Sequence, residues 1–296
     1  MISKYTLFLS VLYVLTFCSC SKNQTSKDKS FTKESSISAD STIGSDLMKY
    51  DISSKDPRII RLPDELKEIS GITMTPDGRM FAEQDEEGIV YQLDYGNGNI
   101  LKKFYLGSPA IKGDFEDIAY AHEKFYMVQS NGDIYEFSEG ENNKAVEYTV
   151  YKTTLSKKND IEGMCYDPKT NTLLLITKGI SGTSDTDVKA AYSFSLPDMK
   201  FNPEPRFELK KSEIKNYFNP SGIEYNGITG TFFVIAANGN MIVEISNEGK
   251  ELGKEKLPPK FHAQPEGITF SKDGTLYISN EGKDQSANLV IYTFNK

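Results

Sequence analysis

Acidic, amide and hydroxyl side chains recur at two equivalent positions along this chain, and their spacing indicates one cluster of oxygen ligands. One position holds Ser70, Glu116, Glu162, Ser221 and Glu266. The position two residues earlier holds Glu68, Asp114, Asp160, Asn219 and Gln264. Carboxylates crowded into a narrow space cannot all ionise cheaply, so some take up protons, pair with a cationic side chain or bind a cation.

Oxygen ligands without histidine or thiolate suit Ca²⁺ better than zinc or copper. The sequence therefore predicts a candidate calcium site formed by Glu68, Asp114, Glu116, Asp160, Glu162 and Glu266. A candidate ligand-binding set adds Ser70, Lys178, Ser221, Asn280 and Glu281, with Lys178 as the main opposing charge. A second interpretation stays open, in which these groups only hydrogen-bond strand amides and waters.

The elements that must position these side chains are five copies of one segment. The copies are KEISGITM at 67–74, DFEDIAY at 114–120, DIEGMCY at 160–166, NPSGIEY at 219–225 and QPEGITF at 264–270. Their aligned residues, Gly71, Asp117, Gly163, Gly222 and Gly267, are separated by 46, 46, 59 and 45 residues. A period in the forties with short alternating strands is typical of β-propeller blades. The third copy is longer because of the loop ISGTSDTD at 180–187.

Each copy predicts a four-stranded antiparallel meander, but the fifth copy ends one strand short. The segment RIIRLP at 58–63 is otherwise unassigned, and pairing it with the last strand closes a ring and removes two exposed edges. The sequence thus predicts an all-β fold over 57–296, a five-bladed β-propeller closed by its N-terminal strand. An open solenoid is the alternative.

In such meanders the first strands begin and the second strands end on one face, so the predicted ligands surround one mouth of the central channel. His122 lies in a turn on the opposite face, and His262 lies in the connection before the fifth copy. Both histidines are expected at the surface, because neither has an evident nucleophile partner. Cys165 lies in an apolar segment and is expected to be a buried, inert thiol.

The N-terminus predicts targeting to the bacterial cell envelope. An apolar run from Thr6 to Phe17 follows a single cation, which indicates a lipoprotein signal peptide over 1–19. Cys20 follows the small Ser19, as the lipidated cysteine of a lipoprotein does, and acyl chains such as palmitate would tether the domain to a membrane. Polar residues from there to position 56 predict a flexible linker. Secretion without lipid is the alternative.

The formal net charge of −8 and the lack of a basic patch disfavour nucleic acid as a partner.

The ordered set of five segments resembles the SdiA-regulated, or YjiK-like, family of bacterial envelope β-propellers. The resemblance covers 57–296 and includes PEGITF and ISNEG in the last copy, where Gly282 replaces a proline of the family pattern. It implies the propeller fold and an envelope location, but no established activity. The family is also distantly similar to calcium-dependent phytases, lactonases and other propellers, and likeness of fold does not transfer chemistry.

These observations predict a membrane-tethered, noncatalytic binding or scaffold protein, whose partner is a small ligand or another envelope protein. A calcium-dependent hydrolase of the phytase or lactonase type is the alternative. In a third interpretation, the sides of the propeller recognise another protein and the channel mouth is structural.

Overall fold

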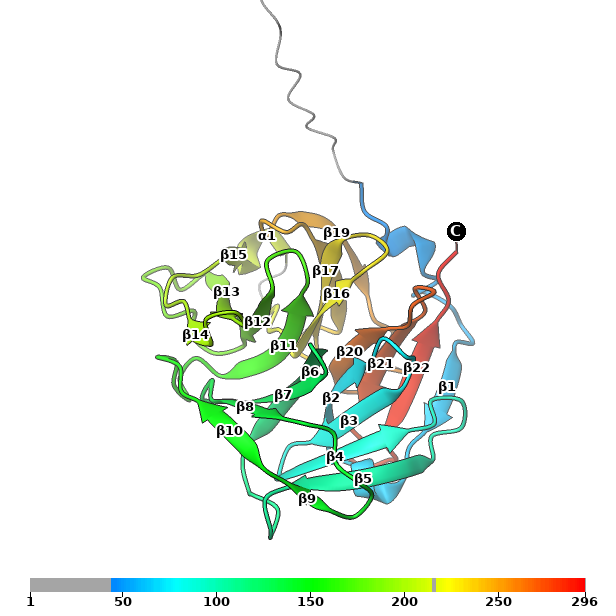
Figure 1. Ribbon diagram of the computed structural model, residues 1–296. Helices are drawn as coiled ribbons and strands as arrows, with labels where there is room; N and C mark the ends of the chain where they lie inside the picture. The colour runs from blue at the N-terminus through cyan, green and yellow to red at the C-terminus, as the bar shows by residue number, and fades with distance from the viewer. Residues whose placement is uncertain (1–43, 215–216, 296) are drawn as a thin grey trace, which may run out of the picture. The chain divides into compact units, whose positions relative to one another are not determined.

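Alternating apolar and polar residues between glycine, asparagine and aspartate turns form short antiparallel strands, which the computed structural model arranges as five blades around a central channel (Figure 1). The structure describes residues 44–214 and 217–295. The predicted signal peptide, Cys20 and most of the predicted linker lie outside the described residues. The prediction of a five-bladed all-β propeller is confirmed.

The first two blades contain nine strands. Blade one consists of β2 (Ile69–Met74), β3 (Met80–Gln84), β4 (Glu87–Leu93), β5 (Ile100–Leu106) and the short parallel strand β9 (Ala145–Val146). Blade two consists of β6 (Phe115–Ala121), β7 (Lys124–Gln129), β8 (Ile134–Phe137) and β10 (Tyr148–Tyr151). The segment expected to be the outer strand of blade two is therefore divided between two blades.

Blade three differs most from a simple meander. It consists of β11 (Ile161–Asp167), β12 (Thr172–Thr177), β13 (Val188–Ser195), β14 (Lys200–Phe201) and β15 (Phe207–Lys210). Both β14 and β15 pair with β13, at opposite ends of that strand. The loop predicted at 180–187 joins β12 to β13, and a short helix, α1 (Lys211–Ile214), follows β15.

The last two blades follow the predicted order. Blade four consists of β16 (Gly222–Asn226), β17 (Thr231–Ala236), β18 (Met241–Ile245) and β19 (Glu251–Lys256). Blade five consists of β20 (Pro265–Phe270), β21 (Leu276–Asn280), β22 (Asn288–Tyr292) and β1 (Arg58–Arg61). Two 3₁₀ helices, η1 (Leu47–Lys49) and η2 (Asp64–Leu66), flank β1 in the sequence.

Ring closure occurs where the sequence predicts it. Strand β1 pairs antiparallel with β22, with Ile60 opposite Leu289. The backbone N–H of Leu62 extends this ladder by donating to the carbonyl of Ala287 at 2.8 Å. The two ends of the domain thereby share one sheet, as Figure 1 shows.

The inner strands β2, β6, β11, β16 and β20 contact one another in sequence around the channel. Glycine at the aligned position permits this approach: a Cβ atom on Gly222 would lie 2.4 Å from the carbonyl oxygen of Glu266. Asp117 takes that position in blade two. Its carboxyl group accepts the N–H groups of Ile118 and Met164, both at 2.8 Å, and so joins β6 to β11.

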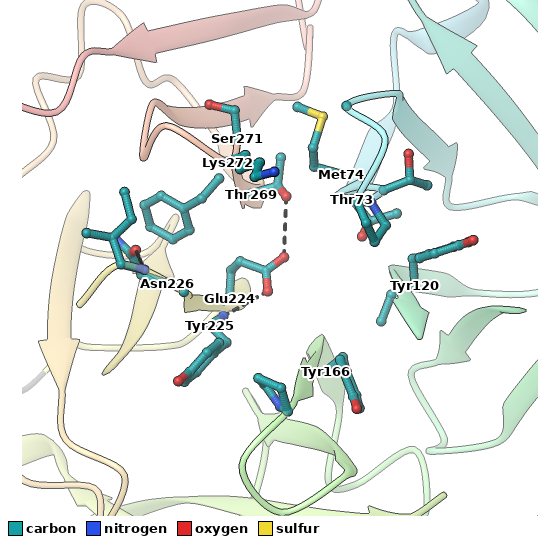
Figure 2. Close-up of a pocket in the computed structure, with 18 residues that line it drawn as sticks. Thr73, Met74, Tyr120, Tyr166, Glu224, Tyr225, Asn226, Thr269, Ser271 and Lys272 are labelled. Atoms are coloured by element: carbon teal, nitrogen blue, oxygen red, sulfur yellow. Dashed lines mark hydrogen bonds between the residues drawn. The ribbon is translucent and has the colours of Figure 1, made fainter. Parts of the chain in front are cut away.

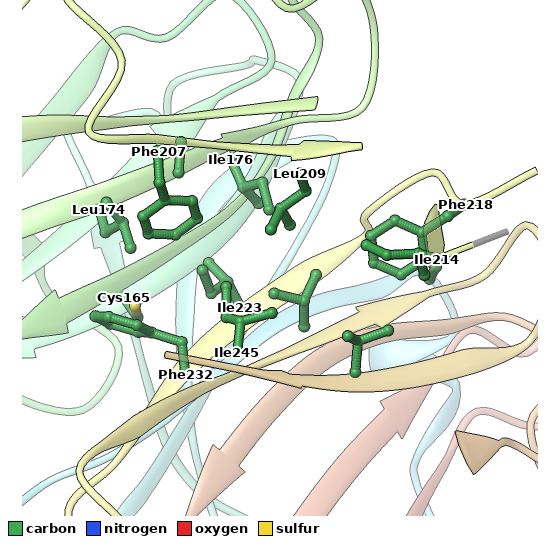
Figure 3. Packing of buried hydrophobic residues seen from close by; sticks show 14 of the residues in the cluster. Cys165, Leu174, Ile176, Phe207, Leu209, Ile214, Phe218, Ile223, Phe232 and Ile245 are labelled. Atoms are coloured by element: carbon green, nitrogen blue, oxygen red, sulfur yellow. The ribbon is translucent and has the colours of Figure 1, made fainter. Parts of the chain in front are cut away.

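Apolar side chains fill the space between neighbouring blades. Figure 3 shows the cluster between blades three and four, where Cys165, Ile176, Ile223 and Phe232 pack together. Burial of such side chains contributes about 25 cal/mol per Å² of apolar surface. Cys165 is 1% exposed, and burial raises the pKa of its thiol well above the ordinary value, as expected for an inert core cysteine.

The folded domain begins earlier than the linker prediction indicates. Leu47, Tyr50 and Ile52 are buried. One carboxylate oxygen of Glu244, on β18, accepts the hydroxyl of Ser45 at 2.8 Å and the N–H groups of Asp46 and Leu47 at 2.7 and 2.9 Å. The polar composition of this segment resembles a linker, but its donors find their acceptor in blade four. No helix within 44–214 or 217–295 is long and apolar enough to span a bilayer.

Candidate functional site

The acidic mouth is defined here as the face of the ring on which the inner strands begin. It holds Glu116 on β6, Glu162 on β11 and Glu266 on β20, as the sequence predicts. Lys178, directly after β12, pairs with Glu162, with 2.8 Å between Nζ and Oε1. The structure thus brings together three predicted acids and the predicted opposing cation.

Electrostatic crowding at the acidic mouth is strong. Burial, and next the charge of Glu162, raise the pKa of Glu116 far above its ordinary value and raise the pKa of Glu266 to about 8. Burial also raises the pKa of Glu162, against the opposing effect of Lys178. Burial disfavours charge on Lys178, but Glu162 outweighs it and the pKa of Lys178 is raised. The acids therefore share protons and one ammonium group.

The remaining predicted acids lie towards the rim. Glu68 and Asp114 are exposed, and the carboxylate of Asp114 accepts the hydroxyl of Ser130 at 2.5 Å. Asp160 has a left-handed backbone with φ of 53°, and its carbonyl accepts the N–H of Lys178 at 2.7 Å. The carboxylate of Glu281 accepts the side-chain amide of Gln264.

Three other predicted ligand residues are used by the fold. The hydroxyl of Ser221 donates to the carbonyl of Pro265 at 2.6 Å, and the carbonyl of Ser70 accepts the hydroxyl of Ser279 at 3.0 Å. Asn280 is fully buried, and its side-chain amide donates to Asn288 at 3.1 Å. Such contacts match the interpretation of these groups as partners of neighbouring strands.

Among the described residues, no three His, Cys, Asp or Glu side chains are grouped closely enough to hold a metal ion. The calcium ion and the calcium-dependent hydrolase therefore stay predictions from the sequence, and the metal content of the purified protein tests both.

The surface prediction for His262 is wrong. This imidazole is 0% exposed, with Nδ1 3.1 Å from Oδ1 of Asn280 and Nε2 2.7 Å from the hydroxyl of Tyr292. Burial lowers the pKa of His262 to about 4, so the ring is neutral at physiological pH. His122 is exposed and lies beside Tyr166, as expected for a residue on the opposite face.

A pocket of about 520 Å³ opens on the opposite face, where the inner strands end. We call it the aromatic pocket. Its wall is formed by one side chain from each inner strand: Met74, Tyr120, Tyr166, Tyr225 and Phe270. Its floor, one residue earlier on four of these strands, is formed by Thr73, Ala119, Glu224 and Thr269.

Glu224 carries the only carboxyl group among the described residues that line the aromatic pocket. Figure 2 shows this carboxyl group directed into the middle of the pocket, between Thr73, Tyr120, Tyr166 and Thr269. Its Oε1 accepts the N–H of Tyr225 at 2.8 Å, and its Oε2 lies 3.4 Å from the hydroxyl of Thr269. Burial raises the pKa of Glu224 to about 8.

Sequence reasoning missed the aromatic pocket, although a signal for it is present. The position three residues after each aligned residue holds an aromatic side chain in four of the five copies and methionine in the fifth. The position directly after each aligned residue is also apolar in all five copies, as expected for core packing, so the aromatic column does not stand out from it. Only the arrangement of the strands around the axis shows that the column surrounds a hollow.

Comparisons with known proteins agree with the observed fold. A family model described as SdiA-regulated matches residues 50–284. No curated protein sequence matches the chain. Among solved structures, a luciferin-regenerating enzyme is similar with a TM-score of 0.51 and 12% identity, over 80% of this chain and 95% of that chain. A glutaminyl cyclase from Myxococcus xanthus is similar with a TM-score of 0.50 and 12% identity, over 80% and 94%. At such identities the likeness concerns the fold alone.

Proposed function

We propose that this chain, which belongs to the SdiA-regulated family, is a noncatalytic binding protein of the bacterial cell envelope. Its propeller holds a small ligand in the aromatic pocket. The observation that carries this proposal is the hollow of about 520 Å³ at the end of the channel, with a side chain from every blade in its wall. Small-molecule sites are typically apolar pockets of roughly 300–1,000 Å³ with a few polar groups that orient the ligand.

The chemistry of the lining favours binding over turnover. The described residues around the aromatic pocket include one carboxyl group, that of Glu224, and one ammonium group, that of Lys272, without a histidine or a thiol. Nucleophilic catalysis needs a nucleophile within hydrogen-bond reach of a base, and acid–base catalysis needs a pair of groups at the reacting atoms. A single carboxyl group among aromatic rings instead supplies affinity and orientation.

Attachment to a membrane through Cys20 is part of this proposal and is supported by the sequence alone. We expect a Cys20→Ser variant to lose incorporation of a palmitate analogue in growing cells and to leave the membrane fraction. The unchanged protein serves as control, and a Cys165→Ser variant, which lacks only the buried thiol, should still incorporate the label. Equal labelling of the Cys20→Ser variant would contradict the anchor without affecting the binding proposal.

The test of binding is a thermal-shift screen of a fragment panel against the purified full-length protein. We expect fragments that raise the unfolding temperature to lose this effect in a Tyr166→Ala variant, because that ring is part of the pocket wall. The same fragments should keep their effect in a Glu116→Gln variant, which changes the acidic mouth instead. Mass spectrometry should recover each bound fragment unchanged.

The reverse pattern, with binding lost in Glu116→Gln and kept in Tyr166→Ala, would place the ligand at the acidic mouth and overturn the choice of pocket. Conversion of a fragment by the unchanged protein, absent in the Tyr166→Ala variant, would overturn the noncatalytic part of the proposal.

A further inference from the structure

We propose that the aromatic pocket binds an amphipathic monoamine, with its ammonium group at the carboxyl group of Glu224 and its apolar body between the aromatic side chains of the wall. This inference rests on the proposed function, because it names the class of ligand that the same pocket takes.

The floor of the pocket provides an acceptor for an ammonium group. Oε1 of Glu224 accepts the backbone N–H of Tyr225 at 2.8 Å, so this oxygen is held in place. Oε2 lies 3.4 Å from the hydroxyl of Thr269, a long contact that leaves it free to accept a stronger hydrogen bond. An ammonium group has three donors, and its hydrogen bonds to a carboxylate are shorter and stronger than those between neutral groups. Glu224 is therefore the anchoring group.

The wall suits both parts of such a ligand. Four of its five side chains are aromatic, and one face of an aromatic ring attracts a cation within about 6 Å of its centre. The same rings and the thioether of Met74 cover apolar surface. An alkyl or aryl amine satisfies both properties, whereas at pH 8 and above, where Glu224 ionises, a carboxylate at the floor would meet its like charge.

The rim limits the ligand to one cationic group. Lys272 lines the aromatic pocket and is exposed, and it follows β20 in the turn to β21. Its ammonium group repels a second positive charge on a ligand that extends out of the pocket. Monoamines are therefore preferred over diamines and polyamines of the same length.

Protonation of Glu224 gives this binding a pH dependence. Burial raises the pKa of Glu224 to about 8, so below that pH an ammonium group must displace a proton. Two neighbouring titratable groups lie on adjacent inner strands, Asp117 on β6 and Cys165 on β11. The pocket lining adds Tyr120, Tyr166, Tyr225 and Lys272. Further out, Lys169 lies over the ring of Tyr225 and His122 lies beside Tyr166. Asp117 and Cys165 are buried with raised pKa values, so Glu224 is the group of the floor that ionises as pH approaches 8.

The experiment compares three probes that share one aromatic body: phenethylamine, phenethyl alcohol and phenylacetate. Calorimetry on the full-length protein should show phenethylamine binding at least about tenfold more tightly than the alcohol at pH 8, with phenylacetate weakest. From pH 6 to pH 8 the affinity for the amine should rise, approaching tenfold per pH unit, while the affinity for the alcohol stays constant.

Variants separate the anchoring group from the pocket. Glu224→Gln should lower the affinity for the amine at least about tenfold and remove the pH dependence of that affinity. The affinity for the alcohol should stay the same. Glu281→Gln, at the acidic mouth, should change neither the affinity for the amine nor the affinity for the alcohol. Lys272→Gln should raise the affinity for the amine a few fold, because it removes an ammonium group that repels the ligand. This variant keeps the inference testable if Glu224→Gln fails to fold.

Equal affinity for the amine and the alcohol, with both lost in Tyr166→Ala, would overturn this inference and leave the proposed function standing. Failure of all three probes to bind would also overturn it, and the fragment screen would then judge the pocket separately. Amine binding that is lost in Glu281→Gln and kept in Glu224→Gln would overturn both.

Discussion

Glu83 and Asp117 are buried carboxyl groups near the channel, whereas Glu224 is partly exposed at the floor of the aromatic pocket. Glu83 on β3 accepts the N–H of Gly71 at 2.6 Å through Oε1, whereas its buried Oε2 has no hydrogen-bond partner among the described residues. Burial raises the pKa of Glu83 and of Glu224 to about 8 and raises that of Asp117 well above its ordinary value. These side chains hold their protons at neutral pH.

Stability should therefore fall as pH rises towards 8. In the unfolded chain Glu83 ionises near pH 4.5, whereas in the folded domain it keeps its proton to about pH 8. Between these values the folded state binds the extra proton, so the free energy of unfolding decreases with rising pH, by up to about 1.4 kcal/mol per pH unit for one such group. We expect Glu83→Gln to reduce this slope between pH 6.5 and 8, as measured by urea denaturation.

The exposed Glu123 supplies the matched control, because Glu123→Gln should keep the slope of the unchanged protein. His262 has the opposite dependence, since its pKa is lowered from 6.5 to about 4, and its contribution near pH 6.5 is the same in both variants and cancels from the comparison. A Glu83→Gln slope equal to that of the unchanged protein would show that Glu83 is already ionised in the folded state.

Strand β1 is the seam of the ring, because its pairing with β22 joins the two ends of the domain. It is the outer strand of blade five, so alternate N–H groups face β22 and solvent. Leu62 donates to the carbonyl of Ala287. By this alternation, the N–H of Ile60 faces β22 and that of Arg61 faces away.

Proline at these two neighbouring positions should therefore have different effects. Ile60→Pro removes a ladder donor and leaves the carbonyl of its partner Leu289 unpaired, at a cost of about 1–3 kcal/mol. Arg61→Pro should cost less, because its N–H has no partner in β22. Thermal unfolding followed by circular dichroism measures this, with about 2–4 °C expected per kcal/mol. Equal losses in the two variants would contradict the register described here.

For the whole molecule, stability depends on contact between all five inner strands. A methyl group on Gly222 would meet the carbonyl oxygen of Glu266 at 2.4 Å, so Gly222→Ala must separate blades four and five. We expect a loss of roughly 1–3 kcal/mol and faster hydrogen exchange in all inner strands, because a closed ring cannot relax at one interface alone. Gly227→Ala is the matched control, since its added methyl group has nothing within 4 Å. Faster exchange confined to blades four and five would contradict this coupling.

The sequence predicts those features that repeat locally. The aligned residues indicate the number of blades, the short fifth copy indicates the role of β1, and the acidic column indicates the acidic mouth. Features that depend on contacts between distant segments were not predictable in this way. His262 is buried because Asn280 and Tyr292 pair with its ring, and residues 44–52 are ordered because Glu244 accepts their donors. The aromatic pocket likewise depends on how far apart five strands hold their side chains.

The bonds between Glu244 and the backbone of Asp46 and Leu47 also determine where mechanical load enters the domain. A pull on the chain ahead of Ser45 reaches this carboxylate, and then the buried side chains of Leu47, Tyr50 and Ile52, before it reaches β1. The force is thus applied to β18 of blade four and not to the outer strand that closes the ring. The hydrogen bonds between β1 and β22 therefore stay intact while force is applied to the N-terminal side of the domain.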